Sequence, residues 1–141
     1  MIKVAIIGLG IMGRRMLQHM RIHEKFEPNY LWDPDKTACQ KAIEIDSEAK
    51  IMNSPEEAID AADLVYLACP PQVREAHAIQ TAQKGKALFL EKPLGIDIDH
   101  SKSLINKLKG FNVPLAVNFT QAAGPALNDL IKAKSDGELG E

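Results

Sequence analysis

Runs of apolar residues alternate along this chain with segments in which apolar positions recur every three or four residues. The apolar runs predict strands at residues 2–7, 28–32, 50–52, 63–69, 86–90 and 114–119. The amphipathic segments between them predict helices at residues 11–24, 35–45, 55–61, 72–84 and 98–109. Several strands are apolar throughout, as strands covered on both faces are. The alternation therefore predicts an α/β fold, a doubly wound and mostly parallel sheet with right-handed crossovers.

Capping residues support these boundaries. Ser54 stands at the N-cap position before Pro55, and Glu57 is placed to close a capping box with it. Gly85 and Gly110 follow the last turns of two other predicted helices, where a glycine readily ends a helix. The length of 141 residues is enough for one domain with a core of its own.

The first predicted strand runs directly into three glycines on the G-x-G-x-x-G spacing, Gly8, Gly10 and Gly13. Gly8 allows a tight turn, Gly10 lets the backbone approach a pyrophosphate, and Gly13 lets the following helix pack on the strand. Ile11 and Met12 complete the turn, and the helix N-terminus offers free N–H groups to an anion. We also expect Gly10 to hold a backbone conformation that a β-branched residue adopts only at a cost. Strand, turn and helix together predict a dinucleotide-binding site.

An acid follows the second predicted strand, about 20 residues beyond the last glycine, where it can accept the ribose hydroxyls of an adenosine. This residue, Asp33, repels a 2′-phosphate, so NAD is favoured over NADP. Lys36 and Arg14 are near enough in sequence to weaken the preference, but solvated helix surface is the interpretation favoured for both. A glycine-rich turn with an unrelated surface acid is the alternative.

The composition is that of an ordinary globular protein, with 45% hydrophobic and 26% charged residues. A net charge of −2 gives no electrostatic support for binding nucleic acid or an anionic membrane surface. Cys39 and Cys69 are far apart and form no C-x-x-C pair, which indicates reduced thiols in a cytoplasmic protein. No apolar run reaches the length of a membrane helix, and no histidine has a partner at metal-ligand spacing, so neither a membrane segment nor a metal is expected.

Ligands of doubly wound sheets bind at the carboxyl ends of the strands, so the polar residues that follow each strand are the site candidates. Besides the glycines and Asp33, these are Cys69, Pro70, Glu91, Lys92 and Asn118. We expect Cys69 to pack against a bound dinucleotide rather than to act as a nucleophile, since no base is placed with it.

Glu91-Lys92-Pro93 is an unusual combination directly after a strand. Partly desolvated near the reactive end of a nicotinamide, Lys92 would donate a hydrogen bond to a substrate hydroxyl and stabilise the developing alkoxide. A cis bond before Pro93 would re-aim that side chain. A plain turn with a surface ion pair explains the same residues, and residue chemistry alone leaves both interpretations open.

Together these motifs resemble the Gfo/Idh/MocA oxidoreductases, a family that includes glucose-fructose oxidoreductase and inositol dehydrogenases. The matching residues run from Ile6-Ile7-Gly8 through Ala68-Cys69-Pro70-Pro71 to Glu91-Lys92-Pro93-Leu94-Gly95. The resemblance implies a Rossmann fold that binds NAD(P) and serves hydride transfer to or from a sugar, cyclitol or related polyol. It implies that Lys92 is catalytic, beside nicotinamide and substrate, with Glu91 at the same site and Asp33 on the ribose. It also implies a homo-oligomeric full-length protein.

The chain departs from the family pattern in three places. Arg74 stands about where members often carry a histidine, with His77 one helical turn further. Members also often carry arginine just before the proline of the linker, where this chain has Gln121-Ala122-Ala123-Gly124-Pro125. Members also continue into a second α/β domain that supplies the acid/base, whereas this sequence ends at Glu141. We therefore expect an NAD(P)-binding domain at residues 1–120, a linker helix and the start of the missing domain at residues 121–141, and no catalysis by the chain alone. A natural short protein that keeps only the nucleotide domain is the alternative.

Two rival functions fit parts of the sequence. The opening Ile7-Gly8-Leu9-Gly10-Ile11-Met12-Gly13 also resembles that of the β-hydroxyacid dehydrogenases, which do not place Glu-Lys-Pro after the fifth strand. A non-catalytic NAD-binding or NAD-sensing module is the second rival, and the short length of the chain favours it.

Overall fold

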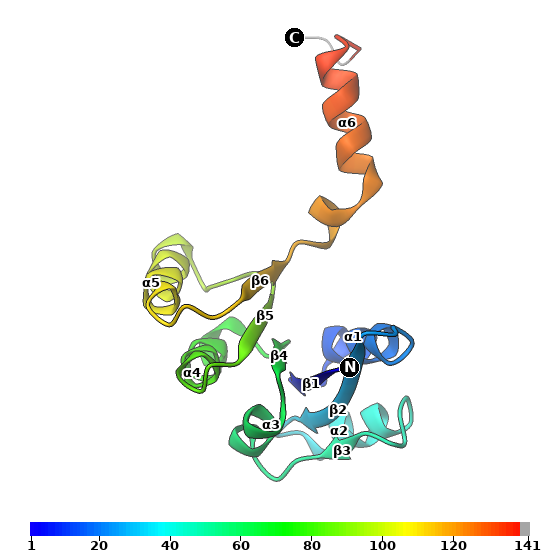
Figure 1. Ribbon diagram of the computed structural model, residues 1–141, viewed down its shortest axis with the longest axis vertical. Helices are drawn as coiled ribbons and strands as arrows, with labels where there is room; N and C mark the ends of the chain where they lie inside the picture. The colour runs from blue at the N-terminus through cyan, green and yellow to red at the C-terminus, as the bar shows by residue number, and fades with distance from the viewer. Residues whose placement is uncertain (139–141) are drawn as a thin grey trace.

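The computed structural model describes residues 1–138, and residues 139–141, at the end of the predicted linker segment, lie outside the described part. Its centre is a six-stranded sheet in the order β3-β2-β1-β4-β5-β6, with every neighbouring pair parallel. The strands are β1 (Ile2–Ile7), β2 (Phe26–Trp32), β3 (Lys50–Ile51), β4 (Leu64–Leu67), β5 (Ala87–Glu91) and β6 (Leu115–Asn118). The chain order reverses between β1 and β4, so their carboxyl ends form the topological switch point. The predicted doubly wound sheet is confirmed (Figure 1).

Helices cover both faces of this sheet and join its strands. They are α1 (Ile11–Arg21), α2 (Lys36–Ile43), α3 (Pro55–Ala61), α4 (Pro71–Gln83) and α5 (Ile98–Lys109), followed after β6 by a 3₁₀ turn, η1 (Thr120–Ala123), and by α6 (Pro125–Ser135). Residues of α1 and α2 pack on one face, and residues of α3, α4 and α5 pack on the other. Of the helices in residues 1–138, none has both the length and the apolar character that a membrane span requires.

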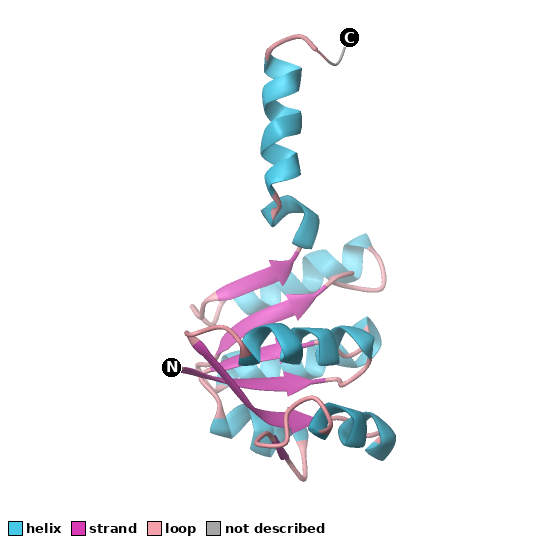
Figure 2. Ribbon diagram, turned by 90° about the vertical axis from the view of Figure 1, so that its right-hand side faces the viewer, coloured by secondary structure: helices cyan, strands magenta, loops and turns pink. Residues whose placement is uncertain are grey.

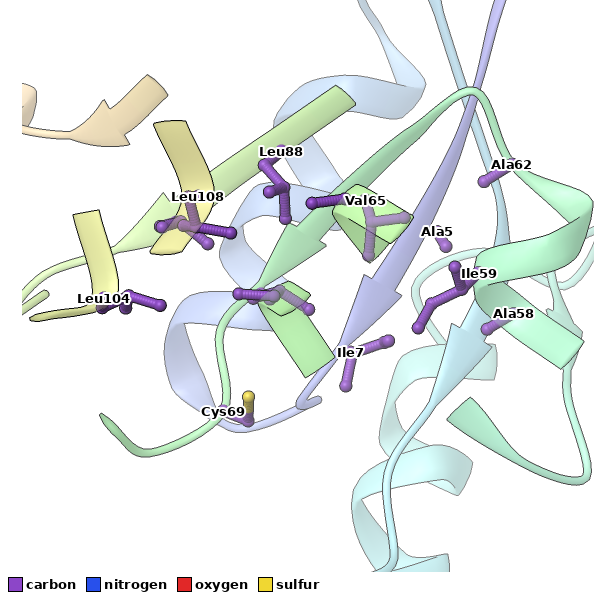
Figure 3. Close-up of a cluster of buried hydrophobic side chains, with 14 residues drawn as sticks. Ala5, Ile7, Ala58, Ile59, Ala62, Val65, Cys69, Leu88, Leu104 and Leu108 are labelled. Atoms are coloured by element: carbon purple, nitrogen blue, oxygen red, sulfur yellow. The ribbon is translucent and has the colours of Figure 1, made fainter. Parts of the chain in front are cut away.

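The core is split by the sheet into two layers, because side chains of a strand alternate between its faces. Val4 and Ile6 of β1 face the layer under α1 and α2, whereas Ala5 and Ile7 face the other. Figure 3 shows this second layer, in which strand residues meet Ile59 of α3 and two leucines of α5. These layers hold the carboxyl ends of the strands at one edge.

Several boundaries differ from those predicted. The strand β2 begins at Phe26, two residues earlier than expected, and α1 ends at Arg21 instead of residue 24. Pro28 lies inside β2 where its register with β1 shifts, as expected of a residue with no N–H for the ladder. The strand β4 is shorter than predicted and ends at Leu67, beyond which the backbone of Ala68 and Cys69 lies against Gly8.

The predicted caps are largely confirmed. The Ser54 Oγ accepts the Glu57 N–H at 3.2 Å, and Pro55 begins α3. The Glu57 carboxylate accepts the backbone N–H of Asn53 at 3.1 Å, one residue earlier than in a capping box. Gly85 follows α4 with a φ of 69°, in the left-handed region where glycine is favoured.

The helix α6 stands away from the sheet (Figure 2). Three large apolar side chains on it are exposed, Leu127, Leu130 and Ile131. An isolated helix of this length has little stability in water, so such a helix is normally stabilised by packing its apolar face against other protein.

Candidate functional site

The predicted site residues come together at the carboxyl edge of the sheet, although they are far apart in sequence. Gly8 follows β1 and Asp33 follows β2, while Cys69 lies just beyond β4. Glu91 ends β5 and pairs in register with Asn118, which ends β6.

The three glycines of the turn have different surroundings. A Cβ on Gly8, whose φ is 94°, would lie 2.5 Å from the backbone nitrogen of Cys69, and a Cβ on Gly13 would overlap the carbonyl oxygen of Gly8. By contrast, a Cβ on Gly10 would meet no atom of the described chain within 4 Å. Gly8 and Gly13 are thus required by the fold, whereas the space beside Gly10 is open to a ligand.

The expectation that Gly10 needs an unusual backbone is wrong. Its φ of −62° and ψ of −166° are accessible to any residue. This residue is also the N-cap of α1, which has neither a capping side chain nor an acidic residue in its first turn. The helix therefore presents its N–H groups and partial positive charge to the open space, as an anion site does.

Asp33 is fastened to this turn through its carboxylate. Its Oδ2 accepts the backbone N–H of Leu9 at 2.6 Å, and its Oδ1 accepts that of Asp35 at 2.8 Å. The residue is half-buried, and each carboxylate oxygen has a further lone pair. The carboxylate can therefore accept hydroxyl groups while it holds the turn.

The side chain of Arg14 also belongs to the turn. Its Nη1 donates to the carbonyl oxygen of Leu9 at 2.6 Å, and the residue is half-buried. The expectation of a solvated helix residue is therefore wrong for Arg14, whereas Lys36 is exposed as expected.

An aromatic pair links the end of β2 to α4. Trp32, which precedes Asp33, meets the imidazole of His77 edge-on, with ring centroids 6.0 Å apart and an interplanar angle of 65°. Burial lowers the pKa of His77, and the nearby Glu56 carboxylate opposes this shift. No sequence pattern indicates this pair, because the two residues belong to different predicted elements.

Cys69 and Pro70 form the loop between β4 and α4. The Cys69 thiol is buried, and burial raises its pKa even though Arg74 is close. A thiol with a raised pKa is a poor nucleophile, which agrees with the sequence interpretation. Pro70 is exposed at the N-cap of α4.

Glu91 is buried beneath this edge of the sheet, with a side-chain network of its own. Its Oε2 accepts hydrogen bonds from the Tyr66 hydroxyl and from the Asn118 Nδ2, the latter at 2.8 Å. Burial and the Glu91 carboxylate raise the pKa of Tyr66 far above its ordinary value, so the phenol stays a donor. The Oε1 of Glu91 is buried and has no hydrogen-bond partner in the described chain. An unpaired buried carboxylate oxygen is costly unless a donor reaches it.

Lys92 is exposed, so the expected partial desolvation is not provided by residues 1–138. The peptide bond before Pro93 is cis, a geometry that the sequence left open. Lys92 lines a cleft of about 660 Å³, which also contains Met12 of the glycine turn and Asn118. The remaining lining residues are Arg15, Phe119, Thr120, Gln121 and Ala122. The two sequence motifs thus meet at one cleft.

A second cleft of about 620 Å³ lies between the loop after Pro93 and α5. It contains none of the predicted site residues. In the described residues 1–138, no three histidine, cysteine or acidic side chains are grouped as metal ligands.

Arg74 is the residue whose role the sequence did not reveal. Its guanidinium is buried, and every partner it binds is a backbone carbonyl of the two loops at this edge, those of Cys69, Glu91 and Pro93. It does not reach the cleft as a lining residue.

Comparisons with known proteins agree with this geometry. The family model described as "Oxidoreductase family, NAD-binding Rossmann fold", GFO_IDH_MocA, matches residues 2–119. An inositol 2-dehydrogenase of Corynebacterium glutamicum is 28% identical over 99% of this chain, which spans 43% of that relative. A scyllo-inositol 2-dehydrogenase (NAD(+)) of Bacillus subtilis is 29% identical over 99% of this chain and 42% of its own length.

The structure of scyllo-inositol dehydrogenase from Lactobacillus casei, with bound NAD(H) and scyllo-inositol, superposes with a TM-score of 0.86 at 16% identity, over 99% of this chain and 42% of the other. This chain thus spans less than half the length of each of these proteins. Sequence motif, sheet topology and family match agree, and the chain belongs to the Gfo/Idh/MocA oxidoreductases, of which it forms the NAD-binding Rossmann domain.

Proposed function

We propose that this chain is the nucleotide domain of an NAD-dependent oxidoreductase that transfers a hydride to or from a sugar, cyclitol or related polyol. The observation that carries the proposal is the cleft shared by Lys92, Met12 and Asn118, which joins the glycine turn to the Glu-Lys-Pro loop. The relatives named as inositol dehydrogenases support the polyol class.

The residues fit a dinucleotide that lies along the carboxyl edge of the sheet. The pyrophosphate would occupy the open space at Gly10 and the uncapped start of α1, with Ile11, Met12 and Gly13 in the first turn. The adenosine ribose would meet Asp33, and the nicotinamide would face the cleft at Lys92. Cys69 and Pro70 would line the middle of this path, and the free oxygen of Glu91 would be available to a donor near Asn118.

NAD is preferred to NADP in this proposal. A 2′-phosphate on the ribose would approach the Asp33 carboxylate, whose negative charge disfavours it. Arg14 keeps its positive charge, but its Nη1 is engaged with the Leu9 carbonyl inside the turn, which limits how the guanidinium can turn toward a 2′-phosphate. Of the two cations considered, only Lys36 is exposed.

Bound NAD supplies the hydride acceptor or donor. The Lys92 ammonium would donate a hydrogen bond to the substrate oxygen and stabilise negative charge on it. Oxidation of an alcohol also requires a base for the hydroxyl proton, and no acid/base side chain lines the described cleft besides Lys92. We propose that residues 1–120 form the nucleotide domain and that residues 121–141 lead into a further domain that supplies this base and closes the cleft. The complete enzyme would be a cytoplasmic homo-oligomer.

Titration of this chain with NADH tests the cofactor part of the proposal. The single tryptophan, Trp32, precedes Asp33 and should transfer excitation energy to bound NADH. A saturable decrease of Trp32 emission that NAD reverses by competition is expected. Absence of saturable binding by fluorescence and calorimetry would contradict the proposed function.

The reaction is tested with the chain joined to the rest of its natural protein, on a panel of cyclitols, aldoses and sugar derivatives. NAD-dependent turnover of at least one polyol is expected. Tight NAD binding without turnover of any of them would favour the non-catalytic module.

A further inference from the structure

Arg74 ties two loops of the site together. The residue is only 2% exposed and projects from α4, just after the Cys69–Pro70 loop. Its Nε and Nη2 donate to the Cys69 carbonyl at 3.1 and 2.6 Å. Its Nη1 donates to the carbonyls of Glu91 and Pro93. One guanidinium thus fixes the chain at the carboxyl ends of both β4 and β5.

The two carbonyls on Nη1 belong to the residues immediately before and after Lys92. The main chain is therefore held on both sides of Lys92, while the Lys92 side chain itself is exposed at the cleft. A side chain that starts from a fixed Cα samples less space, so the Lys92 ammonium is restricted to a smaller region beside the cleft.

The choice of arginine fits this role. A planar fork of donors can reach three carbonyls that face it from two loops, whereas lysine offers its donors from a single point. None of the hydrogen-bond partners of Arg74 is a carboxylate. Burial lowers its pKa, although the nearby Glu91 carboxylate opposes this shift. An apolar side chain would avoid the cost of burying a charge, but it would leave the Cys69, Glu91 and Pro93 carbonyls without these donors.

We propose that Arg74 is the positioning residue of Lys92, holding the Glu91 and Pro93 carbonyls so that the Lys92 ammonium meets the nicotinamide end of the cleft. The inference rests on the proposed function, since it concerns the same cleft. It assigns Arg74 no direct contact with cofactor or substrate.

The test follows the Lys92 side chain in this chain by NMR. Reductive methylation with ¹³C-formaldehyde labels the lysines, and the signal lost in Lys92→Arg identifies Lys92. Two ligands are compared: NADH, which has a nicotinamide ring, and ADP-ribose, which lacks it. In the wild type, the Lys92 signal should shift with NADH and not with ADP-ribose.

Two variants and a control complete the design. Arg74→Gln retains two donors on a shorter side chain, and Arg74→Met has a side chain about as long as glutamine but with no donor. Arg21→Gln is the control, because Arg21 also donates to a backbone carbonyl, that of Ile45, away from the cleft. Both Arg74 variants should lose the NADH-dependent shift while their ADP-ribose affinity stays within about twofold of the wild type. The control should behave as the wild type does.

Each other result overturns the inference in a recognisable way. A shift that persists in Arg74→Gln shows that the position of Lys92 does not depend on the hydrogen bonds of Arg74. A shift lost together with ADP-ribose affinity and melting temperature shows that Arg74 only maintains the fold. If Arg74→Met does not fold, Arg74→Gln decides between these results. If the wild-type chain binds ADP-ribose but its Lys92 signal does not shift with NADH, the placement of Lys92 at the nicotinamide is refuted, and the proposed function with it.

Discussion

Asp33 and Leu9 are joined by a hydrogen bond in which the Asp33 carboxylate accepts the Leu9 backbone N–H at 2.6 Å. The acid after β2 therefore helps to shape the glycine turn after β1, in addition to facing the expected ribose position. A substitution at Asp33 changes both the turn and the ligand contacts, which affects how its variants should be interpreted.

Asp33→Ala should weaken NAD binding by roughly 10- to 150-fold, the equivalent of about 1.5–3 kcal/mol for hydrogen bonds to a charged group. Calorimetry with NAD and ADP-ribose measures this loss, which both ligands should share. Asp35→Ala is the matched control, because Asp35 caps α2 by accepting the Thr37 N–H at 2.8 Å. The control should cost about 1 kcal/mol of stability without loss of NAD affinity. Tighter binding of NADP than of NAD by the wild type would refute the cofactor preference.

Gly10→Val should abolish dinucleotide binding while the fold survives. The Gly10 backbone is accessible to valine and its Cβ would have open space in the described chain, so only the ligand is obstructed. Circular dichroism and the melting temperature should stay close to those of the wild type, and NADH titration should show no binding. Gly13→Val provides the contrast, since its Cβ overlaps the Gly8 carbonyl oxygen and the chain should not fold. Wild-type affinity in Gly10→Val would mean that the phosphate turn lies elsewhere.

Residues 1–141 alone should catalyse no polyol oxidation, because no acid/base side chain besides Lys92 lines the described cleft and none of residues 1–138 covers Lys92. In the complete protein, Lys92→Ala should reduce kcat by about 10²–10⁴-fold and change NAD affinity far less. Steady-state kinetics and calorimetry separate the two quantities. Turnover by the isolated chain, or an unchanged kcat in Lys92→Ala, would contradict the assignment.

His77 should make the stability of the fold depend on pH. Its pKa is lowered in the folded state, so the unfolded chain takes up a proton first as the pH falls through about 6.5. The free energy of unfolding should then decrease from pH 7 downward, until the folded pKa is reached, by at most about 1.4 kcal/mol per pH unit. Urea titrations followed by Trp32 emission measure this slope. His77→Phe should flatten it, whereas His19→Phe, at an exposed histidine of α1, should not.

Much of the fold could be predicted from the sequence because its signals are local. Continuous apolar strands, the glycine spacing and the cap at Ser54 all depend on neighbouring residues. The hydrogen bond between Asp33 and Leu9 joins residues 24 positions apart in the sequence. The hydrogen bonds of Arg74 join residues up to 19 positions apart, and no short sequence pattern encodes either contact. The solvent exposure of Lys92 could not be predicted from the sequence either. The expected partial desolvation would require another segment to cover this residue, and in the described structure Lys92 is exposed.

The parallel pairing of β1 with β4 has a consequence for how the domain folds. The backbone N–H of Lys3 donates to the Asp63 carboxylate at 3.0 Å across 60 residues of sequence, and no strand pair of the sheet is a hairpin. Such non-local contacts must close long loops before they are stabilised, which slows folding. During synthesis, β1 and the glycine turn therefore cannot pair with β4 until β4 has emerged from the ribosome. We expect the incomplete sheet to expose apolar edges in that interval, when the nascent domain would be most prone to aggregation.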